Sequence, residues 1–390
     1  MSTQNYGLLR EGAGNAVVRP IPLPKLRENY VLIRTVAIAL NPTDWTTLDA
    51  NGDDGTIAGC DFAGIVEEVG SAVTKSFKKG DKVTGLAHGA NDEYPEDGAF
   101  ARYITTKGDL LMHVPDGISL EAASAVSCAI GTIGYGLHYI LGVPFPDQDV
   151  AKSGEPILIY GGSTATGSMA IQFAKLFRNA AVGKRIRQDT NGKITKVFDT
   201  VGLDSSAAIC ADAIGPSGGT HCTLLPVETF RKDVESIFFL GYDITGESYK
   251  FEGESYPAKP ELFEWTKKFT TLAEKLWAEG KWQPHPQSVR EGGLLGAVEG
   301  MNLMREGKGP SGEKWVYRVD DTKWPQENEL LGMKREAVRK LQADTDDTHS
   351  PGPFCLNLAG EATRGNIETG LPLQEKLRYY LKEMKLLWNI

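Results

Sequence analysis

The sequence predicts an α/β protein with a β-rich domain first and a doubly wound parallel sheet after it. Three observations predict this class. Short alternating or apolar runs, separated by glycines, fill the first 150 residues. An apolar run, a glycine-rich turn and an amphipathic helix then follow one another from residue 156. The chain has 390 residues, which is enough for two domains of ordinary size.

The first region is predicted to consist of short strands followed by helices. The strand-like runs lie at residues 30–40, 64–70, 81–85 and 98–106. A pair of helices is predicted between Ser119 and Leu141, because Ser119 is a suitable N-cap and Glu121 stands in the first turn. The stretch from Gly142 to Gly154 is rich in Pro, Asp and Gly, which is typical of a linker.

The second region opens with a phosphate-binding pattern. Pro156–Tyr160 is a short apolar run of the kind found in buried parallel strands. Residues 163–177 carry apolar side chains on one broad face, as an amphipathic helix does. Between them, residues 160–167 read Tyr-Gly-Gly-Ser-Thr-Ala-Thr-Gly, and the glycines allow a tight turn and a close approach of phosphates. Because N–H groups at a helix start bind a pyrophosphate, this pattern favours dinucleotide binding over a plain turn.

Later elements complete the second region and continue beyond it. Strands are predicted at 196–200, 221–225 and 235–240, helices at 261–279 and within 289–319, and a final strand at 314–319. The aromatic side chains of helix 261–279 are predicted to be core. After residue 320 the chain is polar and charged, with helices predicted at 333–342 and 374–388 around an unstructured stretch. The apolar stripe of the last helix fits either a docking segment or a helix packed on its own chain.

Composition excludes several classes of function. The net charge is −9 and no long basic run occurs, so nucleic acid and anionic membranes are poor partners. The N-terminus is polar, and no apolar stretch approaches the roughly 20 residues of a membrane span. We therefore expect a cytoplasmic protein. The five cysteines form no CxxC pair and the six histidines no HxxxH pair, which favours buried thiols over disulfides or structural zinc.

Six motifs, taken in order, resemble one family. They are Asn41-Pro-Thr-Asp44, Gly59-Cys-Asp-Phe-Ala-Gly64, Val69-Gly70 before Lys79-Gly-Asp-Lys-Val83, the octet at 160–167, Val197-Phe-Asp-Thr-Val-Gly202, and Gly312-Glu-Lys-Trp-Val-Tyr-Arg-Val319. Residues 5–320 resemble the medium-chain dehydrogenase/reductases and, more closely, the fungal trans-acting enoyl reductases that serve polyketide synthases. The resemblance implies a GroES-like catalytic domain at 1–150, completed by 289–320, a Rossmann-type domain at 151–288, and a C-terminal extension at 321–390 without an assigned role.

The resemblance implies reduction of an α,β-unsaturated polyketide thioester. A hydride from NADP(H) would reach the β-carbon and a proton the α-carbon. The partner would be a polyketide synthase, or a hybrid of polyketide synthase and peptide synthetase, that carries the acyl chain, and the reductase itself would be a monomer. Two alternatives stay open: a free-standing quinone or enone reductase, and a degenerate, non-catalytic partner of a synthase.

The resemblance also assigns site residues. Thr132 and Thr46 are the predicted catalytic residues. Cofactor contacts are predicted for Thr43, Asp44, Trp45, Thr46, Ser163, Thr164, Ala165, Thr166, Leu224, Leu225, Val316 and Tyr317. The acyl chain is predicted to border Ile133, Gly134, Tyr135, Gly136, Leu137, His138, Tyr139, Ile140, Gly241, Tyr242, Asp243, Ile244 and Thr245. Without the resemblance, Leu224, Leu225 and Val316 would be taken as core, and Thr132 equally well as a helix hydroxyl bonded to backbone.

The same comparison predicts that no metal is bound. Zinc-dependent relatives place Cys where this chain has Asn41, and His-Glu where it has Cys60-Asp61. They also carry a four-cysteine lobe near residues 90–110, which contain no cysteine here. Cys60 and Asp61 alone cannot form a three-ligand catalytic site, so the metal-free branch is implied.

The chain departs from the family in two places. After residue 178 a β–α–β stretch of about 30 residues has no counterpart. That stretch carries the groups that read the adenosine ribose, and it covers strand 156–160, which would become an exposed apolar edge. We expect weakened cofactor binding and a fragile domain, although an incorrectly spliced gene model explains the gap equally well. The second departure is Thr46, where relatives often have a Lys that can contact the cofactor phosphate or the substrate.

Overall fold

The computed structural model describes residues 4–50, 52–145, 156–176 and 190–324, and the structural statements that follow concern those residues. They belong to one compact unit, Met1–Thr322, except for the last two. The predicted helices at 333–342 and 374–388, the residues just after 178 and most of the predicted linker lie outside the described residues.

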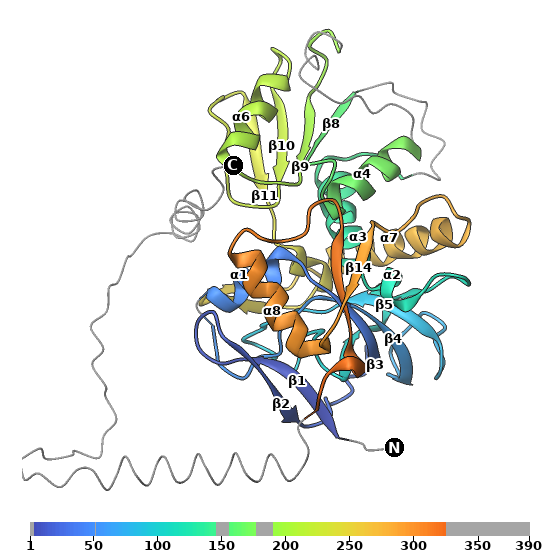
Figure 1. The fold of residues 1–390 in the computed structure, drawn as a ribbon. Coiled ribbons are helices and arrows are strands. Elements are labelled where there is room, and N and C mark those ends of the chain that lie inside the picture. Colours follow the sequence, from blue (N-terminus) through green and yellow to red (C-terminus); the bar gives the residue numbers. More distant parts are fainter. Residues whose placement is uncertain (1–3, 51, 146–155, 177–189, 325–390) are drawn as a thin grey trace, which may run out of the picture. The chain divides into compact units, whose positions relative to one another are not determined.

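The β-rich domain contains a hairpin and a seven-stranded sheet (Figure 1). The hairpin consists of β1 (Asn5–Arg10) and β2 (Ala16–Ile21). The sheet has the order β14-β15-β3-β4-β5-β7, and β6 also pairs with β3. Its strands are β3 (Tyr30–Ala39), β4 (Asp61–Val69), β5 (Lys82–Leu86), β6 (Tyr103–Lys107), β7 (Met112–His113), β14 (Gln287–Arg290) and β15 (Lys314–Arg318). Because β15 runs antiparallel to β3, residues 314–318 return to the sheet that the first residues form.

The strands predicted at 30–40, 64–70, 81–85 and 314–319 are confirmed, and the one at 98–106 is too long. Only Tyr103–Lys107 is a strand, because the residues before it bond to β1 in an irregular way. There the Leu8 N–H donates to the Phe100 carbonyl (2.8 Å), and the Arg102 N–H donates to the Tyr6 carbonyl (2.9 Å).

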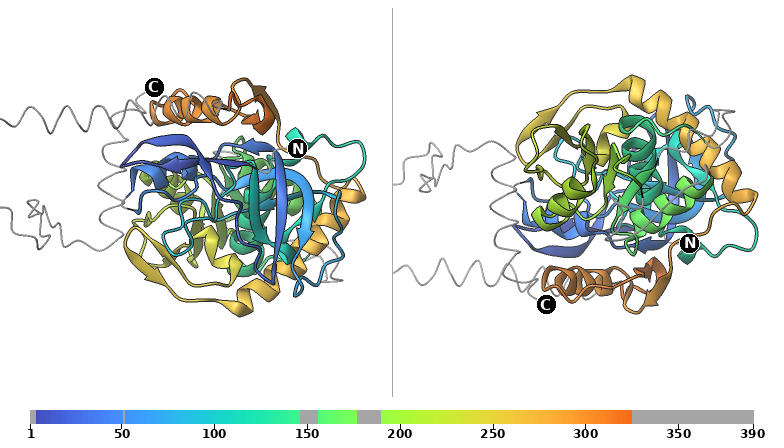
Figure 2. Two further views of the ribbon diagram at one scale, coloured as in Figure 1. Left: turned by 90° about the horizontal axis from the view of Figure 1, so that it is seen from below. Right: turned by 90° about the horizontal axis from the view of Figure 1, so that it is seen from above.

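Two helices flank this sheet. The helix α1 (Pro42–Asp49) follows β3, and α8 (Gly293–Arg305) precedes β15. Figure 2 shows α8, in orange, alongside the N-terminal strands, and it packs against both α1 and β2. Short 3₁₀ turns, η1 (Gly108–Leu110) and η4 (Val319–Asp321), complete the domain.

The second domain is a parallel sheet of four described strands in the order β11-β10-β9-β8. They are β8 (Ile157–Tyr160), β9 (Lys196–Asp199), β10 (Gly219–Thr223) and β11 (Val234–Phe238), and they confirm the four strands predicted there. The helices are α4 (Ala165–Leu176), α6 (Asp204–Ala213) and α7 (Pro260–Ala278). After β11 come η3 (Gly241–Thr245) and a hairpin of β12 (Tyr249–Phe251) and β13 (Glu254–Tyr256).

Among the described strands, β8 forms one edge of this sheet. Only residues 177–189 separate Leu176 from Thr190, which is far fewer than the roughly 30 residues of a β–α–β unit. The predicted gap after residue 178 therefore agrees with the structure. The predicted edge strand is also present, but its apolar side chains are not exposed. Leu158 and Ile159 of β8 are 3% and 7% exposed, because residues of the second domain cover both faces of the strand.

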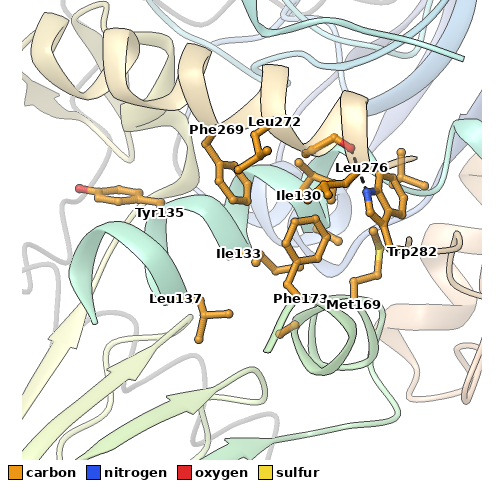
Figure 3. Packing of buried hydrophobic residues seen from close by; sticks show 14 of the residues in the cluster. Ile130, Ile133, Tyr135, Leu137, Met169, Phe173, Phe269, Leu272, Leu276 and Trp282 are labelled. Carbon is orange, nitrogen blue, oxygen red and sulfur yellow. Dashed lines mark hydrogen bonds between the residues drawn. The ribbon is translucent and has the colours of Figure 1, made fainter. Parts of the chain in front are cut away.

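A large apolar core lies where the two domains meet (Figure 3). It is built on α2 (Leu120–Ala123), α3 (Ser127–Ile133) and the π-helix η2 (Gly134–Ile140). Of these, α3 packs against α4 and α7, η2 packs against α7, and α2 packs on the seven-stranded sheet. The predicted cap is confirmed, because Ser119 Oγ accepts from the Ala122 N–H (3.1 Å). Among the described residues, Leu120–Ile140 is the one stretch that by length and composition could cross a membrane. Of its tested window, 72% is buried inside the protein, as in a core helix.

Aromatic side chains dominate this core, as predicted for helix 261–279. Phe269 of α7 is fully buried and stacks on Trp265, with ring centroids 5.7 Å apart. Trp282 is also buried, and its Nε1 donates to the Ala273 carbonyl (2.9 Å), drawn as the dashed line in Figure 3. This bond satisfies the indole N–H inside the core.

Candidate cofactor and substrate site

Hydrogen bonds hold the glycine loop between β8 and α4 in one shape. Gly161 has a φ of 84°, a left-handed conformation that suits glycine. The hydroxyl of Thr200, after β9, donates to the Tyr160 carbonyl (2.7 Å). Thr164 Oγ1 accepts from the Gly167 N–H (2.9 Å) at the start of α4. A Cβ at Gly167 would lie 2.2 Å from the Gly161 carbonyl oxygen, so the helix packs this closely only with glycine there.

This loop presents donors to an anion. Because α4 begins at Ala165, the first N–H groups of the helix have no partner within it. Ser163 is exposed beside them, and the helix dipole favours negative charge at this end. Residues 163–166 therefore fit a pyrophosphate, as predicted for them, and their role as cofactor ligands stays a prediction.

A second group of predicted cofactor residues lies at the start of α1. Pro42 occupies the first turn, and the Asn41 N–H donates to Asp44 Oδ2 (2.6 Å), so the helix is capped at its start. Thr43 Oγ1 lies 3.4 Å from the hydroxyl oxygen of Tyr242 in η3. Two predicted site residues that are 199 positions apart in sequence are therefore in contact here.

The two predicted catalytic hydroxyls both donate to backbone. Thr132 Oγ1 donates to the Cys128 carbonyl (2.7 Å) one turn earlier in α3. Thr46 Oγ1 donates to the Thr43 carbonyl (3.3 Å) in α1. The structure thus has Thr132 as the helix hydroxyl that its residue type alone suggested. Trp45, between these groups in sequence, is half-buried with the Arg305 guanidinium 5.9 Å from its ring centroid.

Asp44 is a buried carboxyl beneath Thr43. Its Oδ2 caps α1, whereas its Oδ1 is buried with no hydrogen-bond partner among the described residues. Burial raises the pKa of Asp44 to about 7, and the charge of Asp61 acts in the same direction. The Asp44 carboxyl therefore changes its protonation state near neutral pH.

A buried lysine lies beside Asn41 and Asp61, which the resemblance aligns with zinc ligands of other relatives. Lys314 of β15 is 5% exposed, and its Nζ donates to Asp61 Oδ2 (2.5 Å) and Asn41 Oδ1 (2.8 Å). Burial lowers the pKa of Lys314, but Asp61, together with Cys128 and Cys60, raises it more, so the ammonium stays charged. The Cys128 N–H donates to Asp61 Oδ1 (2.7 Å), and Asn41 Nδ2 contacts Cys60 Sγ at 3.3 Å.

These contacts do not fit a zinc ion. The ammonium of Lys314 already uses the oxygens of Asp61 and Asn41, and it would repel a second cation. Whether the working protein is free of metal stays a prediction.

Most of the predicted acyl segment 133–140 lies in the core. Ile133 and Leu137 are fully buried and point into it in Figure 3. Gly134 and Gly136 also pack there: a Cβ on Gly136 would lie 2.5 Å from a ring carbon of Phe198, and His138 is 4% exposed. Only Tyr139, 43% exposed, and the half-buried Ile140 reach the surface. The apolar pattern of this segment thus serves packing first.

The two predicted acyl segments meet at Asp243. The hydroxyl of Tyr135 donates to Asp243 Oδ2 (3.1 Å), and Lys259 Nζ donates to the same oxygen (2.6 Å). The hydroxyl of Tyr249 donates to Oδ1 (3.0 Å). Asp243 therefore fixes η3 against the π-helix. Within η3, Gly241 is half-buried, Ile244 is buried, and Thr245 Oγ1 donates to the Tyr242 carbonyl (2.9 Å).

The remaining predicted cofactor residues are mostly packed. Leu224 and Leu225 follow β10 and are half-buried. Val316 is fully buried in a small cluster of alanines, as the core interpretation of it would have it. Tyr317 is 3% exposed and packs against α8, where a Cβ on Gly300 would lie 2.3 Å from its hydroxyl oxygen. The cofactor role of these four residues stays a prediction.

Known proteins match both the β-rich domain and the longer chain. Residues 27–116 match the alcohol dehydrogenase GroES-like domain. The trans-enoyl reductase ACTTS2 of Alternaria alternata is 36% identical over 80% of this chain and 98% of its own length. The trans-enoyl reductase resD of Aspergillus sclerotiorum is 36% identical over 78% and 97%.

The chain belongs to the trans-enoyl reductase family of medium-chain dehydrogenase/reductases. Solved structures show the same fold. An alcohol dehydrogenase superfamily protein from Novosphingobium aromaticivorans superposes with a TM-score of 0.61 at 21% identity, over 81% of this chain and 99% of that one. The CurK enoyl reductase superposes with a TM-score of 0.56 at 18% identity, over 81% and 99%. The predicted GroES-like and Rossmann-type domains are therefore confirmed as folds.

The alignment to ACTTS2 also supports the gap that the sequence predicts in this trans-enoyl reductase. It extends over 342 positions but covers 80% of 390 residues, or about 312, so about 30 positions of the relative lack a counterpart here. That number agrees with the length of one β–α–β unit.

One group of described side chains has spacing that could hold a metal: Asp199, Cys210 and His221, all buried. Asp199 already accepts from Ser206 Oγ (2.6 Å) and from the Val201 and Gly202 N–H groups (2.9 and 3.0 Å), with His221 Nε2 at 3.3 Å. Burial raises the pKa of Cys210 well above its ordinary value, so its thiol stays protonated. In this family member, Asp199 therefore organises the turn after β9.

Two residues of the site escaped the sequence reasoning. Lys314 could have been found from its place in the apolar strand 314–319, because a buried lysine needs a carboxylate partner. Thr200 lies within the motif at 197–202, but nothing in the sequence indicates that it bonds the glycine loop.

Proposed function

We propose that this trans-enoyl reductase uses NADPH to reduce an α,β-unsaturated polyketide thioester during secondary-metabolite biosynthesis. One observation carries the proposal: 36% identity to ACTTS2 over 98% of that trans-enoyl reductase. The geometry supports it, because the glycine loop keeps its phosphate-binding shape and the start of α1 meets η3.

The nicotinamide supplies a hydride to the β-carbon of the substrate when it is bound. The chain's own residues bind and orient the reactants. In this proposal the N–H groups of residues 163–166 hold the pyrophosphate, while Thr43 and Thr46 line the nicotinamide side. Residues 241–245 border the acyl chain, and Tyr139 marks the surface end of the other acyl segment.

The proposed setting follows from the family. The partner is a polyketide synthase, or its hybrid with a peptide synthetase, and the reductase acts as a cytoplasmic monomer. In this assignment the catalytic domain is 1–150 with 289–320, the dinucleotide-binding domain is 151–288, and the extension is 321–390. A net charge of −9 argues against a nucleic-acid partner.

The proposal is tested by adding the crotonyl thioester of N-acetylcysteamine and NADPH to the purified chain. We expect NADPH oxidation coupled to one equivalent of butyryl thioester, detected by mass spectrometry. A chain that reduces a soluble quinone far faster than the thioester would instead be a free-standing quinone reductase.

A third outcome is specific to this sequence. A folded chain that binds a polyketide synthase but oxidises no NADPH would be a non-catalytic partner. The missing β–α–β stretch and Thr46 favour that alternative, so synthase binding is measured alongside turnover.

A further inference from the structure

Tyr242 brings the predicted acyl segment 241–245 into contact with the start of α1. It lies on η3, after the last strand of the parallel sheet, and its hydroxyl oxygen is 3.4 Å from Thr43 Oγ1 of the catalytic domain. Its side chain is 8% exposed. The predicted role of Tyr242 was only to border the acyl chain, whereas its hydroxyl lies against the residue predicted to line the nicotinamide.

The ring of Tyr242 is held on two sides. It stacks on His88 with centroids 3.6 Å apart and an interplanar angle of 14°. The ring of Tyr249 packs edge-on to it, with centroids 6.2 Å apart at 78°. His88 adds no charge to this stack, because burial lowers its pKa to about 3. The two neighbouring rings therefore fix the direction of the Tyr242 hydroxyl, and the stacked His88 ring is uncharged.

The hydroxyl of Tyr242 stays protonated. Burial raises its pKa well above its ordinary value, and this outweighs the hydrogen bond with Thr43, which lowers it. Such a group is a poor acid but a good hydrogen-bond donor at neutral pH.

The hydroxyls of Thr46 in α1 and Thr132 in α3 already donate to other groups. A hydroxyl has one proton to donate, and Thr46 and Thr132 donate theirs to backbone carbonyls. Among the described residues, the Tyr242 hydroxyl has only the long contact to Thr43 Oγ1, in which either oxygen can donate, and a hydrogen bond of 3.4 Å is weak and easily exchanged for a better one. The Tyr242 hydroxyl can therefore give up this weak contact and donate a hydrogen bond to a substrate oxygen.

We propose that Tyr242 is a catalytic residue whose hydroxyl donates a hydrogen bond to the thioester carbonyl oxygen of the substrate. This inference rests on the proposed function. As the β-carbon accepts the hydride, the π electrons of the C=C bond move toward the carbonyl, and its oxygen becomes negative. The Tyr242 hydroxyl stabilises that oxygen and keeps its own proton. A proton from water then bonds to the α-carbon and the C=O bond re-forms. A donor aimed at a developing oxyanion is worth about 10²- to 10³-fold in kcat.

The test is Tyr242→Phe, which keeps the ring and its stacking on His88 and removes only the hydroxyl. We expect kcat for the crotonyl thioester to fall by about 10²- to 10³-fold, with the Kd for NADPH unchanged. The matched control is Tyr30→Phe. Tyr30 is equally buried, and its hydroxyl donates to Glu247 (2.6 Å) away from α1, so this variant should keep wild-type turnover.

A second measurement separates hydrogen bonding from structure. Infrared difference spectra of the crotonyl thioester bound with NADP⁺ report the C=O stretch, which a hydrogen bond lowers. We expect a lowered frequency in the wild type and in Tyr30→Phe, and the unbonded frequency in Tyr242→Phe. If Tyr242→Phe does not fold, 3-fluorotyrosine at this position keeps the ring and makes a stronger donor, so the stretch should fall further.

The inference would be overturned if Tyr242→Phe kept wild-type turnover. It would also be overturned if the C=O stretching frequency were the same in the wild type, Tyr242→Phe and the fluorinated variant. Equal losses in turnover and NADPH affinity without a spectral change would overturn it as well, because they indicate a purely structural residue. Failure of the wild type itself to reduce the thioester would instead refute the proposed function.

Discussion

Two fully buried carboxylates show how differently the two domains are held together. Asp61, at the start of β4, accepts from the ammonium of Lys314, more than 250 residues away in sequence. Asp199, at the end of β9, is bonded by Ser206, His221 and the N–H groups of the turn that follows it. Asp61 therefore takes part in a long-range ion pair, whereas the partners of Asp199 lie within 22 residues of it in sequence.

The bonding of Asp199 does not depend on the missing stretch. Every partner of Asp199 named above lies between residues 201 and 221, beyond the missing stretch. Burial raises the pKa of Asp199, but the bonds from His221, Ser206 and the turn N–H groups lower it more, so the carboxylate is well satisfied. The β-rich domain differs, because its buried carboxylate pairs with Lys314 of the returning strand β15.

The largest expected effect is therefore on the ion pair of the catalytic domain. Lys314→Met leaves Asp61 buried without its counter-charge, and we expect the free energy of unfolding to fall by about 3–5 kcal/mol. The measurement is urea denaturation. The control is Lys308→Met, since Lys308 pairs with Glu306 on the surface and such pairs are worth about 0–1 kcal/mol. Equal losses in both variants would mean that burial of the pair does not matter.

A smaller effect is expected in the parallel sheet. Ser206→Ala removes the 2.6 Å bond to Asp199 and the Ser206 bond to the Leu203 N–H, but the other donors remain. We expect a loss of about 1.5–3 kcal/mol, as for a buried hydrogen bond to a charged group. The control is Ser205→Ala at the exposed neighbouring position. A Ser206→Ala loss as large as that of Lys314→Met would remove the contrast between the two domains.

The sequence predicted regular elements better than side-chain networks. The strands around residues 30, 64, 81 and 196 were found because their apolar periodicity is local. Lys314, Asn41 and Asp61 come from three separate segments, so only the folded chain brings them together. The π-helix 134–140 was predicted as part of a helix, and its burial was missed because an apolar run has the same composition in a core and beside an acyl chain.

The missing stretch gives the third test. The described part of the sheet has no strand beyond β8, and in the described residues no second strand therefore offers a place to read the adenosine ribose and its 2′-phosphate. We expect NADPH and NADH to bind weakly, with Kd values within about tenfold of each other, a difference of at most about 1.4 kcal/mol. Nicotinamide fluorescence measures both. Inserting the corresponding stretch of ACTTS2 after residue 178 should restore a preference, and strong NADPH selectivity without it would contradict this account.

The smallest expected effect is a pH dependence at a joint between the domains. His113 of β7 bonds Glu274 Oε1 of α7 (2.7 Å), with Asp81 at 3.5 Å, while Lys75 Nζ bonds the other Glu274 oxygen, Oε2, at 3.3 Å. The bond to Glu274 raises the pKa of His113 above its ordinary 6.5. A raised folded-state pKa means that the contribution is complete below about pH 6.5 and is lost as the pH rises through the folded value. Because His113 is 40% exposed, we expect its contribution to the free energy of unfolding to be less than about 1 kcal/mol.

Urea denaturation of wild type and His113→Gln from pH 5 to 9 should show the stability advantage of the wild type shrinking as the pH rises. An advantage that grows with pH would mean that Lys75, and not His113, is the main partner of Glu274.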